Sequence, residues 1–124
     1  MSKKILADVA EFVGFQVDEN EEEIGPFTAQ LLLNINSEIS KLVQLGVVPP
    51  EMFTEEVTSE TTWADILPNE SVLSMAKTYV KIGVRLIFDP PTSSALLDAY
   101  KHEKDECEWR AWFAAERLRD HKTP

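Results

Sequence analysis

The chain has 124 residues, which is enough for one compact domain with its own hydrophobic core. Hydrophobic residues make up 44% and charged residues 27%, a balance that excludes both a disordered tail and a membrane protein. The net charge of −10 argues against a protein that reads nucleic acid, because carboxylates repel phosphates. The first residues, MSKKILADVAEF, lack the apolar core of a signal peptide. We therefore expect synthesis and retention in a cytoplasm, without membrane contact.

The first part of the chain predicts two helices separated by an acidic segment. Apolar side chains recur at helical spacing over 3–13 and again over 26–45, and Gly14 and Gly46 are the expected terminators. The second helix also has an expected polar face, formed by Asn34, Asn36, Ser37 and Ser40. Residues 16–25, QVDENEEEIG, are interpreted as a solvated linker.

Residues 47–68, VVPPEMFTEEVTSETTWADILP, interrupt the helical period. Pro49 and Pro50 favour extended backbone, and the stretch after them fits a strand, a hairpin or an irregular arm. Thr61 or Thr62 is expected to cap a one-turn helix, WADIL. A non-helical insertion of this length in a helical protein usually carries function or is disordered.

Two more helices are predicted in the second half, one after the cap residue Asn69 and one after Ser93 or Ser94. The first ends at about residue 88, where the sequence DPP (Asp89, Pro90 and Pro91) predicts a stiff elbow. The second continues to about residue 119.

The middle of this last helix, 101–108, is nearly all charged, so we expect the helix to extend beyond the core of the domain. The predicted fold is an all-α small bundle of four main helices in a single domain, 1–124. Within it, 47–68 is a long non-helical arm and 111–124 is a C-terminal extension.

The sequence offers no convincing catalytic or metal-binding pattern. Cys107 is the single cysteine and lies among carboxylates, which raise the pKa of a thiol. His102 and His121 are far apart, and no acidic pair, nucleophile elbow or phosphate loop accompanies them. We expect no enzyme activity, no cofactor and no metal.

Three aromatic side chains near the end of the last helix suit association better. Trp109 and Trp112 are three residues apart and Phe113 lies beside them, so they either complete the core or form an interface anchor. Arg110 and Arg117 make this part of the helix basic. In an otherwise acidic chain, such an asymmetry suits head-to-tail packing of identical subunits, although cations are also favoured at any helix C-terminus.

The order of several stretches resembles a family of small proteins of tailed bacteriophages, described as head–tail connector or adaptor proteins. The resemblance covers roughly residues 1–110 and rests on LLLNINSEISKLVQLGVVPPEMF, then TTWADIL, then YVKIGVRLIFDPPTSSALLDAYKHEKDECEWR. The run VRLIFDPPTSS followed by EWR is the most specific part. This chain departs from the family pattern at Gly83, where a bulkier residue is common, and in its longer C-terminal end.

The resemblance implies a structural virion protein that forms a ring at the head–tail junction. The implied partners are the portal protein, the next neck, stopper or tail-completion protein, and further copies of the chain in a homo-oligomeric ring, with a dodecamer expected. Double-stranded DNA would pass through the channel without sequence-specific binding, and the ring would help to retain packaged DNA. Assembly is expected in the cytoplasm of the bacterial host.

The matching motif positions are assigned to fold and assembly, and to no catalytic role. They are Trp63 and Asp65 in the loop, Arg85, Asp89, Pro90 and Pro91 at the elbow, and Trp109 and Arg110 in the last helix, to which we add Trp112, Phe113 and Arg117. The alternative interpretation is an acidic helical regulator that binds a partner protein as a monomer or dimer.

Overall fold

The computed structural model describes residues 3–15, 25–67 and 69–122, with the backbone alone at 119–122. Most of the acidic segment predicted as a linker therefore lies outside the described residues. The described chain forms five α-helices: α1 (Ile5–Phe12), α2 (Thr28–Gln44), α3 (Trp63–Ile66), α4 (Glu70–Phe88) and α5 (Ser94–Lys122). Short 3-10 helices occur at Gly25–Phe27 and Pro50–Met52. The all-α prediction with four main helices is confirmed.

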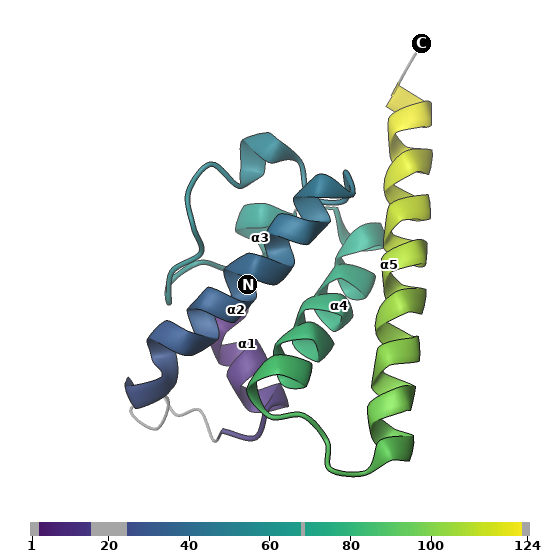
Figure 1. Cartoon of the computed structure of the whole chain (residues 1–124). Coiled ribbons are helices and arrows are strands. Elements are labelled where there is room, and N and C mark those ends of the chain that lie inside the picture. Colours follow the sequence, from purple (N-terminus) through teal and green to yellow (C-terminus); the bar gives the residue numbers. More distant parts are fainter. Residues whose placement is uncertain (1–2, 16–24, 68, 123–124) are drawn as a thin grey trace.

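Helix α4 lies at the centre of the bundle, with α1 and α2 on one side and α5 on the other (Figure 1). The predicted apolar stripes form the core, because Leu31, Ile35 and Ile39 of α2 and Val80 and Val84 of α4 are all fully buried. The helix ends also follow the sequence. Gly14 and Gly46 adopt positive φ values of 110° and 80° just after α1 and α2, a conformation that glycine adopts without steric cost.

The segment between α2 and α3 is irregular, but it folds against the domain and does not project as an arm. Val47, Val48 and Val57 are at most 4% exposed, so this segment contributes to the core. Asn36 of α2 holds Val57 at both backbone atoms: its Oδ1 accepts from the Val57 N–H at 2.6 Å, and its Nδ2 donates to the Val57 carbonyl at 3.2 Å. The described residues contain one isolated antiparallel bridge, Lys4 with Thr62, and no strand.

Helices α4 and α5 run antiparallel and pack along their length (Figure 1). The inward side of α5 consists of small residues, Cys107, Ala111 and Ala115, which are at most 6% exposed. The charged middle of α5 is therefore docked on the core. The expected extension of the helix beyond the core is made by its C-terminal turns, which rise beyond the ends of the other helices (Figure 1). No helix in the described part of the chain is long and apolar enough to cross a membrane.

Candidate assembly interface

The residues assigned from sequence to fold and assembly lie in three separate places. Trp63 and Asp65 belong to α3, the elbow residues connect α4 to α5, and the aromatic and arginine side chains lie on the later turns of α5. These places do not combine into one site.

Trp63 is fully buried and serves the fold. Its indole Nε1 donates to Asp8 Oδ2 at 2.9 Å, which ties α3 to α1. Asp65 stabilises the same short helix, because its Oδ2 accepts from the N–H of the cap residue Thr62 at 2.9 Å. The predicted one-turn helix and its threonine cap are thus confirmed, but the Trp63 side chain is not available on the surface of the chain.

The elbow reverses the chain between α4 and α5. Arg85 Nε donates to the Asp89 carbonyl at 3.1 Å, and the Arg85 guanidinium lies 5.6 Å from the centre of the Tyr100 ring on α5. Pro90 is exposed, whereas Pro91 is buried. The elbow is therefore stiffened by its prolines and held by Arg85, a side chain of α4 that contacts both the elbow and α5.

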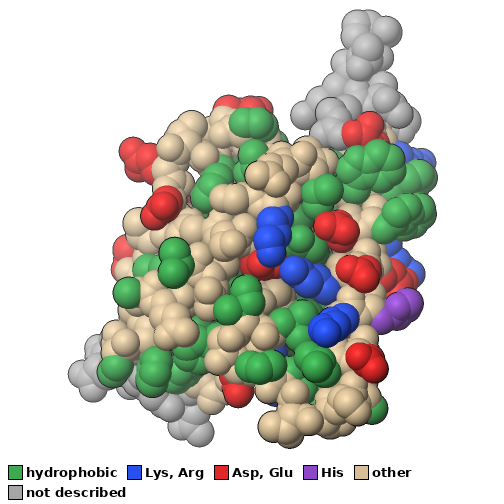
Figure 2. Space-filling view, viewed as in Figure 1, with side chains coloured by type: hydrophobic (Ala, Val, Ile, Leu, Met, Phe, Trp, Pro, Cys, Tyr) green, Lys and Arg blue, Asp and Glu red, His purple; other side chains and the backbone are tan. Residues whose placement is uncertain are grey.

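The third place is an exposed surface on α5, which we call the aromatic–arginine face: Trp109, Arg110, Trp112, Phe113 and Arg117. Trp109 is 59% exposed, Trp112 40% and Phe113 44%. Trp109 and Phe113 stack with ring centres 5.4 Å apart and planes 9° apart, and Arg117 lies 5.9 Å from the Phe113 ring centre. Figure 2 shows hydrophobic side chains gathered on the upper part of α5. Within the single chain, these aromatics do not complete the core.

A shallow apolar hollow adjoins this face. It has a volume of about 250 Å³ and is lined by Ser71 at the start of α4 and by Ala114, Arg117 and Leu118 of α5. Arg117 therefore borders both the hollow and the stacked rings. Exposed stacked aromatics beside a hollow are typical of protein–protein contact surfaces, since such rings bury a large area at little cost in conformational entropy.

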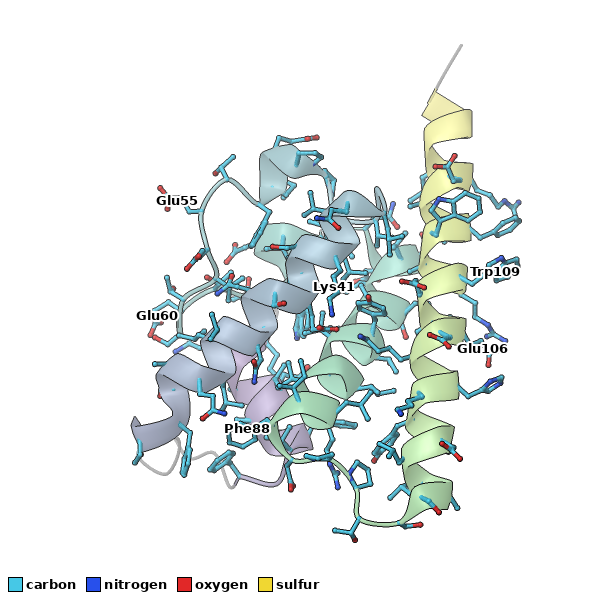
Figure 3. The ribbon with its side chains drawn as sticks, in the orientation of Figure 1. Lys41, Glu55, Glu60, Phe88, Glu106 and Trp109 are labelled. Atoms are coloured by element: carbon cyan, nitrogen blue, oxygen red, sulfur yellow. The ribbon has the colours of Figure 1, made fainter. Side chains whose placement is uncertain are left out.

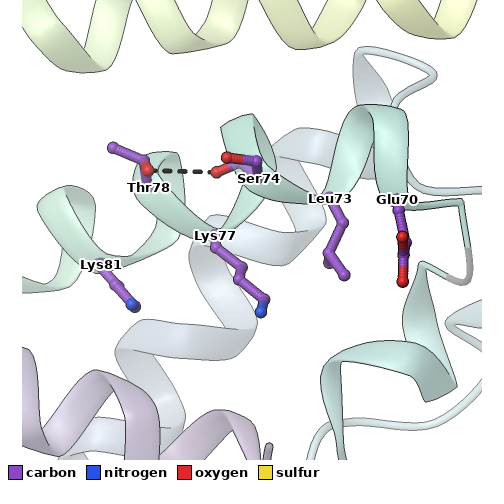
Figure 4. A pocket seen from close by; sticks show the side chains of 6 residues that line it. All are labelled: Glu70, Leu73, Ser74, Lys77, Thr78 and Lys81. Carbon is purple, nitrogen blue, oxygen red and sulfur yellow. Dashed lines mark hydrogen bonds between the residues drawn. The ribbon is translucent and has the colours of Figure 1, made fainter. Parts of the chain in front are cut away.

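A second concave region follows one side of α4, but it does not have the composition of a catalytic site. It has a volume of about 390 Å³ and is lined by Glu70, Leu73, Ser74, Lys77, Thr78 and Lys81 (Figure 4). Its lysines have structural roles: Lys81 Nζ pairs with Asp8 Oδ1 at 3.1 Å, and Lys77 Nζ lies 6.0 Å from the Trp63 ring centre. No cluster of metal-ligating side chains occurs among the described residues.

Sequence inspection missed a buried ion-pair cluster that joins α2, α4 and α5. Glu38 of α2 is fully buried, and its carboxylate lies 2.8 Å from Lys41 Nζ and 2.8 Å from Lys104 Nζ of α5. The Lys104 ammonium also lies 4.7 Å from the ring centre of Tyr79 on α4. Burial and the nearby Glu38 carboxylate raise the pKa of Tyr79 well above its usual value. This cluster anchors the charged middle of α5.

Gly83 makes this cluster possible. A Cβ atom at Gly83 would overlap Glu38 Oε1 and would lie 2.5 Å from its Cδ. The backbone of α4 is thus closely approached at Gly83, and the group that approaches is a carboxylate. Within the predicted polar face of α2, Asn34 and Asn36 are also only 9% exposed, whereas Ser37 is exposed. The signal in the sequence was a glycine in the interior of a predicted helix, which permits the close approach of another side chain.

Asp8 is the second buried carboxylate. Burial by itself disfavours its charged form, but Lys81, the Trp63 indole and Lys3 together outweigh that effect and hold the pKa of Asp8 below its usual value. The carboxylate links α1, α3 and α4. Its ionised form is therefore part of the folded structure at neutral pH.

Cys107 has the opposite character. Burial, with a further contribution from Glu103, raises the pKa of the Cys107 thiol to about 11. The direction agrees with the sequence-based expectation, although burial is the larger cause. A thiol with this pKa is protonated at neutral pH and is a poor nucleophile. It acts as a small side chain in the contact between α5 and α4.

The chain is thus a small all-α protein with an exposed aromatic–arginine face. The chain matches the model of a family described as phage connector protein over residues 5–117. It therefore belongs to the phage connector protein family, and the resemblance noted from its motifs is confirmed. No curated protein and no solved structure matches the chain significantly.

Membership has direct consequences for function. Phage connectors are structural proteins of the virion, not enzymes, and they interact with other head or tail proteins. The match continues through Arg117 and so includes the whole aromatic–arginine face, further along the chain than the motifs alone indicated. The first half of the predicted C-terminal extension, residues 111–117, is thus part of the family pattern.

Proposed function

We propose that this chain forms a ring-shaped adaptor between the portal protein and the tail, or the next neck component, of a tailed phage. Each copy would contact its neighbours in the ring, the portal on one side, and a stopper or tail-completion protein on the other. A dodecamer matched to the portal is the expected copy number. The observation that carries the proposal is an exposed aromatic–arginine face on a member of the connector family.

The elbow supports the ring. Identical subunits close into a ring only when the rotation from each subunit to the next is constant. The α4–α5 pair provides a fixed shape for this purpose. Arg85 of α4 contacts the Asp89 carbonyl and the Tyr100 ring of α5, and Pro91, in the connection between the two helices, is buried. The buried pair of Lys104 with Glu38 fixes α5 at a second point farther along the helix.

The charge supports passage of DNA. The chain has a net charge of −10, and a channel wall rich in carboxylates gives phosphate groups no attractive site. Double-stranded DNA would therefore slide through the ring without sequence-specific binding. The assembled neck would help to retain the packaged DNA until ejection.

Immunogold electron microscopy of purified virions tests the location directly. An antibody against this chain should label only the head–tail junction, and disrupted virions provide the control for access to the epitope. Label absent from intact and disrupted virions, with the chain present only in lysates of infected cells, would support the acidic regulator instead.

Mass photometry of the chain mixed with the portal protein tests the ring. The adaptor role requires one closed set of copies per portal. A single copy or a dimer bound to each portal would contradict the proposal.

A further inference from the structure

We propose that, in the assembled ring, the aromatic–arginine face of each copy is covered by the acidic loop of the next copy. The acidic loop is defined as residues 51–60, which carry Glu51, Glu55, Glu56 and Glu60. This inference rests on the proposed ring adaptor and names the two surfaces that meet within it. It assigns the aromatic–arginine face to a second copy of this chain and not to the portal.

The aromatic–arginine face is complementary to a partner surface that carries both carboxylates and apolar groups. Trp109 and Phe113 are already stacked, so little side-chain freedom remains to be lost on binding. Arg117 is held beside Phe113 and next to the apolar hollow of about 250 Å³. Arg110 is paired with Glu106 at 2.6 Å in the free chain, so Arg117 is the main cation available to a new carboxylate.

The acidic loop has a fixed conformation. The Asn36 side chain holds both backbone atoms of Val57, and the Val57 side chain is 4% exposed. Directly before this buried anchor, Glu55 and Glu56 are exposed, and the described residues provide neither of them with an ion-pair partner. A rigid backbone thus displays two carboxylates in water, where a cationic surface of another molecule is their natural counterpart.

The two surfaces lie on opposite sides of the molecule. Figure 3 shows Glu55 and Glu60 at one edge and Trp109 at the other, with the helices between them. Because the surfaces point away from each other, a two-fold dimer cannot satisfy both in one contact. Head-to-tail contacts use both in every copy, and such contacts close into a ring when the rotation per copy permits it.

Charge reversal gives a sharp test, because the two surfaces belong to one chain. The arginine-reversed variant carries Arg110→Glu and Arg117→Glu, and the loop-reversed variant carries Glu55→Lys and Glu56→Lys. Each variant alone places like charges at every contact of a ring. We expect each to raise the concentration needed for half-assembly on the portal by about tenfold or more.

Combining the reversals should restore assembly in two ways. The chain with all four substitutions has opposite charges at every contact again, and it keeps the parent net charge of −10. An equal mixture of the arginine-reversed and the loop-reversed variant should also assemble, as an alternating ring in which opposite charges meet at every contact. Both preparations should assemble within about threefold of the parent, as measured by mass photometry with the portal.

Matched controls are available on the first half of α5. Lys101→Glu makes the net charge more negative, as the arginine-reversed variant does, and Asp98→Lys makes it less negative, as the loop-reversed variant does. Both residues are exposed and lie outside the two surfaces. We expect neither to change assembly by more than about twofold. Circular dichroism of every variant checks that the helices remain folded.

Three results would overturn the inference. If the arginine-reversed and the loop-reversed variant each assembled like the parent, the two surfaces would not meet, although the proposed ring adaptor would not be contradicted. An arginine-reversed variant that loses portal binding, and is not rescued by the loop reversal, would assign the aromatic–arginine face to the portal. A parent chain that never forms rings on the portal would overturn the proposed function as well.

Discussion

Replacing Gly83 with alanine adds one methyl group in the middle of α4, where two opposing effects meet. Alanine is favoured over glycine inside a helix by about 1 kcal/mol, so helix propensity alone predicts a more stable protein. The new Cβ, however, would overlap Glu38 Oε1 and lie 2.5 Å from Glu38 Cδ. Glu38 is fully buried and has no solvent into which its carboxylate can move.

The magnitude follows from what the displaced carboxylate loses. Glu38 lies 2.8 Å from both Lys41 Nζ and Lys104 Nζ, and a shift large enough to admit the methyl group breaks this geometry. Disrupting a buried ion pair while the charge remains buried costs about 3–5 kcal/mol. After the gain in helix propensity is subtracted, Gly83→Ala should lower the free energy of unfolding by about 2–4 kcal/mol.

Urea unfolding followed by circular dichroism at a helical wavelength measures this change. A loss of this size is a large fraction of the stability of a domain of this length and should lower the midpoint of thermal unfolding by roughly 10 °C. Gly25→Ala is the control, because a Cβ at Gly25 meets no atom of the described residues within 4 Å.

A double-mutant cycle identifies the cause. In a Glu38→Ala background the obstructing carboxylate is absent, so Gly83→Ala should be neutral or stabilising there. If Gly83→Ala stabilised the parent chain by about 1 kcal/mol, helix propensity would dominate. Gly83 would then not be required to admit the Glu38 carboxylate.

Three further outcomes follow from the structure. The folded structure lowers the pKa of Asp8, so its ionised form stabilises the folded state fully above the unfolded pKa of about 3.9. This stabilisation is lost as the pH falls through the folded-state pKa. Asp8→Asn should therefore reduce the free energy of unfolding at pH 7 and flatten the acid limb of a stability–pH profile. Trp109→Ala removes a 59% exposed side chain, so the helical signal should be unchanged and the free energy of unfolding should stay within about 1 kcal/mol of the parent while assembly weakens; a large loss of stability would place Trp109 in the core. Asn36→Ala leaves the Val57 N–H and carbonyl without their partner and should cost about 2–4 kcal/mol in urea unfolding, with faster amide exchange at Val57 as the local readout.

Much of the fold was accessible from sequence because it depends on local signals. Helical periodicity placed the four main helices, glycines marked the ends of the first two, and the DPP elbow separated α4 from α5. The cap residue Asn69 and the one-turn helix at Trp63 were also predicted, since both depend on a few neighbouring residues.

The remaining features depend on contacts between residues far apart in sequence. Trp63 resembled a surface motif residue, and only the position of Asp8 shows why it is buried. The charged middle of α5 suggested solvent, yet Lys104 reaches a carboxylate buried in another helix. The helix contacts the core through Cys107 and Ala111, which are small and contribute little to a hydrophobic pattern that contains large exposed aromatics.

The positions of the three tryptophans give the protein two separate optical reporters. Trp63 is shielded from solvent and hydrogen-bonded to a carboxylate, whereas Trp109 and Trp112 are open to water. Acrylamide should therefore quench the fluorescence of the two α5 tryptophans and leave that of Trp63 largely intact. Binding that covers α5 would shift their emission to shorter wavelength without unfolding, and unfolding would expose Trp63 as well. Association and folding of this connector are thus separable in one cuvette, without an added label.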